Sequence, residues 1–325
     1  MSLRPRPRTS IAFCLLTTAA LAAAGIGAAK AGTSPHRAGT LPVSYSFAAG
    51  FAAGFAAPTT PPPGANDFGC APSAAHPYPV ILVHGTFENM NDNWRAAAPS
   101  LVNHGYCVFA FNYGGATASD DLQGTGDIAA SAQTLAAFVD KVLTATGASK
   151  VDLVGHSQGG MMPRYYIDNL GGADKVDKLI GLAPSNYGTT LDGLFTLVST
   201  LNTVLPVNAG LTASCAACAE QEQGSPFLSA LNARPTVPGV TYTLIESRDD
   251  EVVTPYTSAF LTGRHVTNIT VQNQCPVDHT DHLEIAYDPV TLADVLNALD
   301  PAHQVRVPCL PVLPLTGPVG PVPKF

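Results

Sequence analysis

An alternation of short apolar runs with longer helical patterns, from residue 79 onward, constrains the fold most strongly. The short runs are rich in β-branched residues and nearly continuous in apolar character, as expected of strands covered on both faces. They span residues 80–83, 107–111, 151–154, 178–182, 241–245 and 266–271. Strands that alternate with helices favour an α/β fold with a mainly parallel sheet and helices on both of its faces.

The longest helical pattern runs from Asp127 to Thr146, where apolar residues recur at i, i+3, i+4 and i+7 and Gly147 can end the helix. Further helices are predicted at residues 92–103, 158–170, 225–232 and 291–299. The stretch over residues 185–238 is long for a connection between two strands and carries leucines at helical spacing. We therefore predict that this segment forms a small helical cap, or lid, over a site.

Residues 1–31 have the pattern of an export signal. Three arginines lie between positions 4 and 8, residues 11–27 are apolar or small, and Ala29-Lys30-Ala31 supplies a cleavage site. A membrane anchor is the alternative, but this Ala- and Gly-rich run is short for a bilayer that needs ~20 apolar residues. We expect cleavage near Gly32 and a soluble, secreted mature chain.

The segments that flank the main body are compositionally biased. Over residues 32–66 the motif Phe-Ala-Ala-Gly repeats from Phe47, and four prolines follow between positions 58 and 63. An interfacial helix would show a charged face, which this stripe lacks, so we expect a low-complexity leader that packs loosely on the body. The main domain is predicted over residues 67–309. Residues 310–325 form a Pro-rich tail, which we expect to be extended and outside any sheet.

The charge balance bears on the possible partners. The whole chain has a formal charge of −8, but the first 31 residues hold four basic side chains and no acidic one. Without them, 12 basic residues stand against 24 acidic ones, a balance of −12. Binding to nucleic acid relies on a basic surface, so neither nucleic acid nor an anionic lipid surface is expected as a partner.

Six cysteines remain outside the predicted export signal: Cys70, Cys107, Cys215, Cys218, Cys275 and Cys309. In an oxidising compartment an even set predicts three disulfides, although spacing alone leaves 15 possible pairings. The C-x-x-C pair at 215–218 could instead be half of a zinc site or a redox pair. Zinc needs two further ligands, and no second C-x-x-C or closely spaced histidine pair accompanies it. No metal and no cofactor are therefore predicted.

The strongest motif is Gly155-His-Ser-Gln-Gly159, between a predicted strand and a predicted helix. In this context the serine occupies a strained backbone position at a sharp turn, and the glycines let the helix pass close to the strand. The motif alone is weak evidence, because a structural serine in a strand-to-helix turn is the alternative. Its context predicts that Ser157 is a nucleophile.

A serine nucleophile needs a histidine base, and the imidazole needs a carboxylate that orients it. On a fold of this kind the acid and then the base follow the serine in the chain. Three acids follow the fifth predicted strand, and we choose Asp250, then Asp249, then Glu251. Two histidines lie in the loop after the last predicted strand, and we favour His282 over His279.

The reaction of such a nucleophile with an acyl group also needs donors for the developing oxyanion. The usual donors are the N–H of the residue after the nucleophile and one from the loop after an early strand. Gln158 fills the first position and Thr86 the second, through its N–H and with its hydroxyl as a further candidate. His84 and His156 precede the acid in the chain, so we expect them to shape turns.

Five pieces of sequence, in this order and spacing, carry a resemblance. They are Val83-His-Gly-Thr86, Ser157-Gln-Gly-Gly160, Leu182-Ala-Pro-Ser-Asn-Tyr-Gly188, Asp250-Glu-Val-Val-Thr-Pro255 and Asp281-His-Leu-Glu-Ile285. Between about Cys70 and Cys309 the chain resembles the secreted lipases of the α/β-hydrolase fold, in particular bacterial class 2 lipases. In its motifs it is also similar to the fungal lipase B of Candida antarctica.

The resemblance implies a role for each site residue: Ser157 is the nucleophile, Asp250 the orienting acid, His282 the base, and Thr86 with Gln158 the oxyanion donors. It also implies disulfides between Cys70 and Cys107 and between Cys275 and Cys309, which leaves Cys215 to pair with Cys218. The chain departs from the fungal pattern at His84, where that pattern has proline, and in the 215–218 pair. These departures bear on the cap and on acyl preference.

The function expected from these residues is that of a secreted serine esterase or lipase that cleaves acyl esters such as triacylglycerols. We expect a monomer that touches a lipid interface only transiently. An acyltransferase or a polyester hydrolase with the same triad is the alternative within the enzyme class. A non-catalytic binding module is the alternative outside it, although such modules commonly lose a triad member and here every role has a candidate.

Overall fold

The structure, a computed structural model, describes residues 40–204 and 215–325. The predicted export signal, the first residues of the predicted leader (32–39) and residues 205–214 of the predicted cap lie outside the described residues. Within the described ranges, no helix is both long enough and apolar enough to cross a bilayer.

Six parallel strands form the central sheet in the order β2-β1-β3-β4-β5-β6. Their bounds are β1 (Val80–Val83), β2 (Val108–Ala110), β3 (Val151–His156), β4 (Val176–Leu182), β5 (Thr241–Glu246) and β6 (Val266–Thr270). All six predicted strands are therefore confirmed. The residues after each strand meet at the carboxyl edge of the sheet, where ligands bind in open α/β folds.

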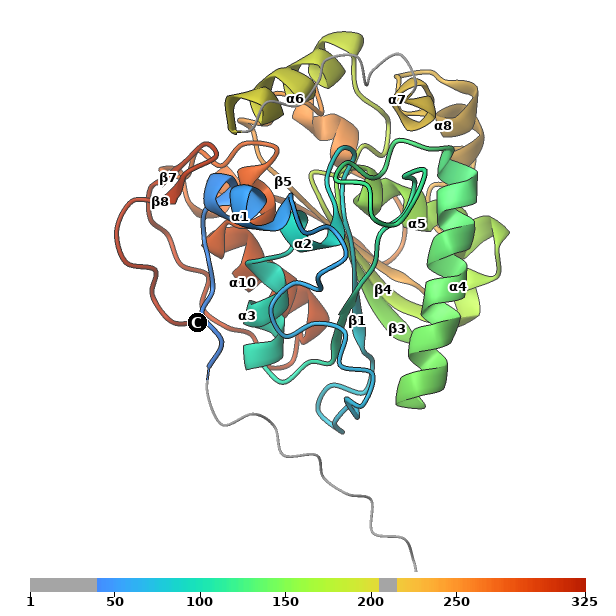
Figure 1. Ribbon diagram of the computed structural model, residues 1–325, viewed down its shortest axis with the longest axis horizontal. Helices are drawn as coiled ribbons and strands as arrows, with labels where there is room; N and C mark the ends of the chain where they lie inside the picture. Colours follow the sequence, from blue (N-terminus) through green and yellow to red (C-terminus); the bar gives the residue numbers. More distant parts are fainter. Residues whose placement is uncertain (1–39, 205–214) are drawn as a thin grey trace, which may run out of the picture. The chain divides into compact units, whose positions relative to one another are not determined.

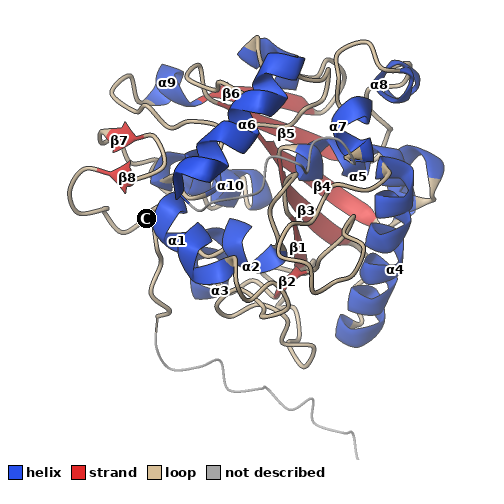
Figure 2. Ribbon diagram, turned by 45° about the horizontal axis from the view of Figure 1, so that its top comes forward, coloured by secondary structure: helices blue, strands red, loops and turns tan. Residues whose placement is uncertain are grey.

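Helices cover both faces of this sheet (Figures 1 and 2). On one face α4 (Ile128–Thr146) packs against α5 (Gln158–Asn169), and on the other α3 (Ala97–Asn103) packs against α10 (Pro289–Leu299). The remaining helices are α1 (Phe47–Gly54), α2 (Met90–Asn93), α6 (Leu191–Val204), α7 (Ala216–Glu220), α8 (Pro226–Leu231) and α9 (Val271–Gln274). Single turns of 3-10 helix lie at Gly172–Asp174, Tyr256–Ala259 and Glu284–Ala286. This arrangement is the α/β-hydrolase fold.

Local signals account for the helix ends. Asp127 caps α4 by accepting a hydrogen bond from the N–H of Ala130 at 2.7 Å, and Gly147 ends the helix in the left-handed region at φ 69°. The helix predicted over residues 92–103 is instead divided into α2 and α3. The break falls at Trp94, which leaves helical geometry and buries its ring completely.

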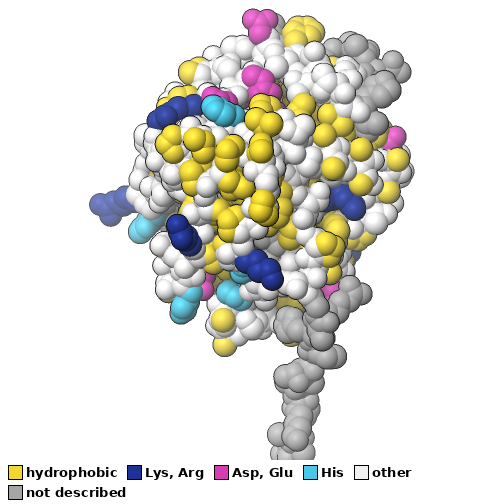
Figure 3. Space-filling model, turned by 90° about the vertical axis from the view of Figure 1, so that its left-hand side faces the viewer, with side chains coloured by type: hydrophobic (Ala, Val, Ile, Leu, Met, Phe, Trp, Pro, Cys, Tyr) yellow, Lys and Arg dark blue, Asp and Glu magenta, His cyan; other side chains and the backbone are white. Residues whose placement is uncertain are grey.

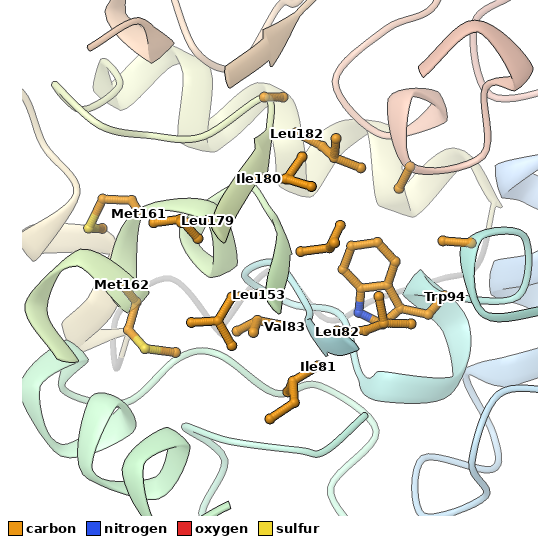
Figure 4. Close-up of a cluster of buried hydrophobic side chains, with 14 of the residues drawn as sticks. Ile81, Leu82, Val83, Trp94, Leu153, Met161, Met162, Leu179, Ile180 and Leu182 are labelled. Atoms are coloured by element: carbon orange, nitrogen blue, oxygen red, sulfur yellow. The ribbon is translucent and has the colours of Figure 1, made fainter. Parts of the chain in front are cut away.

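The core lies between the sheet and its helices (Figure 4). Leucine, isoleucine and valine side chains of β1, β3 and β4 meet the two methionines of α5 and the indole of Trp94 there. Each fully buried aliphatic side chain of this kind contributes ~1.5–3 kcal/mol. The core therefore holds the ends of β1 and β3, which carry site residues, in fixed positions.

The expectation of a loosely packed leader is wrong for residues 47–54. These residues form α1, and the rings of Phe47 and Phe51 are fully buried. Gly50 and Gly54 are buried on the same face as the two rings. Gly50 is needed there because a Cβ would overlap the ring of Tyr287. The period-four stripe is thus a protein-facing surface, and its small residues let the helix approach closely. The N–H of Phe47 also donates to Oε2 of Glu284 at 2.9 Å, two residues beyond the predicted base.

The expectation that the tail stays outside any sheet is also wrong. Strands β7 (Val312–Leu313) and β8 (Gly317–Pro318) pair antiparallel, and Val312 is fully buried. The carbonyl of Val312 accepts a hydrogen bond from the N–H of His279 at 3.0 Å, which ties the tail to the loop of the predicted base. The face that carries α1 and this ribbon gathers many hydrophobic side chains (Figure 3).

The structure pairs the six cysteines as the resemblance implies: Cys70 with Cys107, Cys215 with Cys218, and Cys275 with Cys309. The first bridge joins the loop before β1 to the residue before β2. The second lies at the start of α7, and the third joins the end of α9 to the C-terminal segment.

Candidate active site

Ser157 lies at a sharp turn between β3 and α5. Its backbone has φ 54° and ψ −121°, a strained conformation for a residue with a Cβ. The flanking glycines are required by close packing, because a Cβ on Gly155 would overlap the carbonyl oxygen of Gly159, and one on Gly159 would overlap that of Val83. The turn therefore lifts the serine side chain at the carboxyl edge of the sheet, as its motif predicts.

The side chains of Ser157, His282 and Asp250, from distant parts of the chain, form a continuous row of contacts. Oγ of Ser157 lies 3.0 Å from Nε2 of His282, and Nδ1 of that ring lies 2.7 Å from Oδ2 of Asp250. The second carboxylate oxygen of Asp250 accepts the N–H groups of Val252 at 2.7 Å and Val253 at 2.8 Å. Because Asp250 is an acceptor, Nδ1 of His282 carries the proton, which leaves Nε2 free to accept from the serine hydroxyl.

Burial and the neighbouring carboxylates shift the pKa of His282 in opposite directions. Complete burial lowers the pKa of the ring, whereas the charge and hydrogen bond of Asp250 and the charges of Glu251 and Glu88 raise it. The net result is a pKa above the ordinary value of a histidine. A base of this kind can take a proton from the serine and hold it as a stabilised imidazolium.

The runner-up residues Asp249, His279 and Glu251 make other contacts. Asp249 and His279 bind each other at 2.8 Å and remain about half exposed, at 41% and 59% of their side-chain surface. Glu251 accepts the backbone N–H of His282 at 3.4 Å, and burial and then the charge of Asp281 raise its pKa to about 7.

The predicted oxyanion residues lie together beside the serine. Gly85 precedes Thr86, and a Cβ on that glycine would lie 3.3 Å from the Cβ of Ser157. Gln158 is the first residue of α5, so its N–H has no acceptor within the helix. Its side-chain Nε2 donates to Oγ1 of Thr86 at 2.8 Å, which joins the two predicted donors directly.

A second buried histidine–carboxylate pair, His156 with Glu88, lies next to the serine turn. The sequence analysis did not predict it. Nδ1 of His156 lies 2.8 Å from Oε2 of Glu88, with both side chains almost fully buried. The Glu88 carboxylate also accepts Asn93 Nδ2 at 2.8 Å and the N–H of Gly85 at 3.1 Å. Nε2 of His156 lies 2.8 Å from the carbonyl oxygen of His282. His156 therefore does more than shape the turn, and only its place beside the nucleophile could have indicated this.

The ring of His84 contacts its own loop and Tyr113, as expected of a residue that shapes a turn. Burial lowers its pKa to about 4, so the ring is neutral, and it stacks on Tyr113 with 4.2 Å between ring centroids. Its Nδ1 lies 2.8 Å from the carbonyl oxygen of Gly85. This ring thus supports the loop that carries Thr86.

No group of three or more His, Cys, Asp or Glu residues in the described ranges is placed to hold a metal ion.

The sheet, the strained serine turn and the Ser-His-Asp arrangement together define the class of α/β-hydrolases with a serine-type site. Within that class the chain belongs to the class 2 lipase family, which it matches over residues 77–293, more than half of its length.

Two triacylglycerol lipases illustrate the sequence similarity. That of Pseudarthrobacter phenanthrenivorans is 44% identical over 97 residues, which is 28% of this chain and 28% of the relative. That of Vibrio cholerae is 32% identical over 126 residues, which is 33% of this chain and 38% of the relative. The aligned region thus spans well under half of either relative.

Two solved structures illustrate the similarity of fold. Aspergillus fumigatus lipase B aligns with a TM-score of 0.56 at 19% identity, over 76% of this chain and 57% of that one. The mature lipase BlEst2 of Bacillus licheniformis aligns with a TM-score of 0.50 at 18% identity, over 70% of this chain and 94% of that one. At this level of identity the comparison concerns the fold alone.

Proposed function

We propose that the protein is a secreted serine carboxylester hydrolase that cleaves acyl esters, in particular triacylglycerols, through an acyl-enzyme on Ser157. The observation that carries the proposal is the continuous contact from the serine hydroxyl through His282 to Asp250. Membership of a lipase family supports the ester as substrate. The three disulfides support export to an oxidising compartment.

In the proposed reaction Oγ of Ser157 attacks the ester carbonyl while Nε2 of His282 takes its proton. The negative charge that develops on the carbonyl oxygen is stabilised by the N–H groups of Gln158 and Thr86. The imidazolium returns the proton to the departing alcohol, which leaves an acyl group on the serine. Water activated by the same histidine then attacks the acyl-enzyme and releases the acid.

The cap is the proposed source of acyl preference. Helix α6 buries Leu194, Leu197 and Leu201 while the ring of Phe195 is 62% exposed. An apolar cap favours apolar acyl chains, because each buried methylene contributes ~0.8 kcal/mol. The exposed ring is also suited to transient contact with a lipid interface. Rates that fell steadily from acetate to octanoate esters would contradict the preference.

The proposal is tested with the purified mature protein, a series of p-nitrophenyl esters and an emulsified triglyceride. We expect hydrolysis of these substrates, and we expect Ser157→Ala to lower kcat by about six orders of magnitude without loss of the fold. Circular dichroism and the unfolding midpoint serve as controls for folding. Turnover retained by the folded Ser157→Ala variant would refute the proposal.

A further inference from the structure

We infer that Gln221, a residue of the cap, is a positioning residue that holds the Thr86 hydroxyl as a further oxyanion donor. The inference rests on the proposed function and deepens it. Sequence reasoning assigned no role to Gln221, which is nearly fully buried.

The first step concerns the hydrogen-bond acceptors of Thr86. Its Oγ1 lies 2.8 Å from Nε2 of Gln158 and 3.0 Å from Nε2 of Gln221. A hydroxyl oxygen has two acceptor positions and one hydrogen. Two donated N–H groups fill both acceptor positions, so the hydrogen of Thr86 has to point away from both amides.

The second step concerns the orientation of the two amides. Nε2 of Gln158 also lies 2.8 Å from the carbonyl oxygen of Gly124, and Nε2 of Gln221 lies 3.2 Å from that of Ala217. A carbonyl oxygen only accepts, so each of these atoms is an NH₂ group that gives one hydrogen to Thr86 and one to the backbone. Oε1 of Gln221 accepts from the hydroxyl of Ser185 at 2.8 Å, which fixes the same orientation.

The third step concerns what holds Gln221 itself. It follows α7, whose first turn is closed by the Cys215–Cys218 disulfide. Its N–H donates to Ala217 at 3.0 Å, and its carbonyl oxygen accepts from Thr189 at 2.9 Å. The α7 backbone is in turn joined to the loop beside the site, because the N–H of Ala217 donates to the carbonyl of Thr125 at 3.2 Å.

These contacts join the cap to the predicted oxyanion site through one amide. Because both acceptor positions of Thr86 are occupied, the O–H group of Thr86 is already oriented as a donor before substrate binds. A donor that needs no reorientation stabilises a developing charge more than one that must turn during the reaction. The cap thus supplies part of the catalytic geometry in addition to any contact with the acyl chain.

The test is a double-mutant cycle on ester hydrolysis with Thr86→Val, which removes only the hydroxyl, and Gln221→Met, which removes only the amide. We expect Thr86→Val to lower kcat by about 100-fold. Gln221→Met should lower kcat by about tenfold and change KM by less than about twofold, because the hydroxyl remains but loses its direction. The double variant should be no slower than Thr86→Val alone, since the amide acts only through the hydroxyl.

Gln223→Met is the matched control. Gln223 lies two residues away on the same segment, but its side chain is exposed and donates to the carbonyl of Thr254 at 2.8 Å. We expect this variant to keep the kcat of the wild type. Unfolding midpoints of all variants separate loss of positioning from loss of fold.

A second variant, Gln221→Glu, keeps the shape but replaces the donor by an acceptor. The introduced carboxylate would accept the hydrogen of Thr86 and turn it from the oxyanion. Its kcat should therefore fall at least as far as that of Gln221→Met, and the ratio of its kcat to that of the wild type at the same pH should rise as the pH is lowered and the carboxyl becomes protonated.

The inference would be overturned if the fold-losses in kcat of the two single variants multiplied in the double variant. It would also be overturned if Gln221→Met had the same kcat as Gln223→Met. Either result with an active wild type would leave the proposed function standing. A wild type that hydrolyses no ester would overturn the proposed function, and the inference with it.

Discussion

The carbonyl oxygen of His282 accepts a hydrogen bond from Nε2 of His156 at 2.8 Å, although the two residues lie 126 positions apart. His156 in turn binds the buried carboxylate of Glu88. The backbone of the proposed base is thus fastened to the residue before the proposed nucleophile, while its side chain contacts Asp250 and Ser157. Two histidine–carboxylate pairs therefore lie side by side, one at the reacting atoms and one behind them.

This relationship predicts a large effect of Glu88→Leu on stability. Removal of one partner leaves His156 buried without its carboxylate, which costs about 3–5 kcal/mol. The free energy of unfolding in urea measures the loss. Asp249→Leu is the matched control, because Asp249 binds His279 at the same 2.8 Å but on the surface, where a pair contributes less than about 1 kcal/mol. Equal losses in the two variants would contradict the structural role given to Glu88.

The choice of acid is tested by comparing Asp250→Asn with Asp249→Asn. The amide at position 250 can donate to Nδ1 of His282, which favours the wrong tautomer of the ring, so kcat should fall by about 10⁴-fold. Asp249 instead binds His279 on the surface, and its variant should stay within about twofold of the wild type. Steady-state kinetics on one p-nitrophenyl ester measures both. Comparable losses would make the assignment of Asp250 untenable.

The raised pKa of His282 predicts the acid limb of the pH profile. The base has to be neutral, so kcat/KM should rise with pH through a midpoint above the ordinary histidine value. The charge of Glu251 contributes to the raised pKa, so Glu251→Gln should move this limb to lower pH. Asp249→Asn serves again as the control. A limb that moved to higher pH would contradict the electrostatic account.

The sheet could be predicted from the sequence because its strands are covered on both faces and are therefore nearly continuous apolar runs. Ser157, Asp250 and His282 could be chosen as candidates because this fold orders nucleophile, acid and base along the chain. Their meeting in space is a property of the fold that periodicity alone does not show.

Other features could not be predicted, for identifiable physical reasons. The α1 stripe has no charged face because it packs on protein, where Gly50 admits the ring of Tyr287 and Gly54 lies against the backbone of Asp92. The contact of Gln221 with Thr86 joins a side-chain amide to a hydroxyl 135 positions away, and no local pattern encodes it. The same holds for Glu88, whose partner is 68 positions away. Buried polar contacts of this kind follow from tertiary packing.

The central claim is that Ser157 is activated by His282, and covalent labelling tests it most directly. The folded wild type is treated with a fluorophosphonate at neutral pH, and the modified residue is located by peptide mass spectrometry. We predict stoichiometric modification of Ser157 alone, and its loss in a folded His282→Ala variant, because an unactivated serine hydroxyl is a poor nucleophile. An unmodified wild type, a label on another residue, or equally fast labelling of His282→Ala would contradict the account.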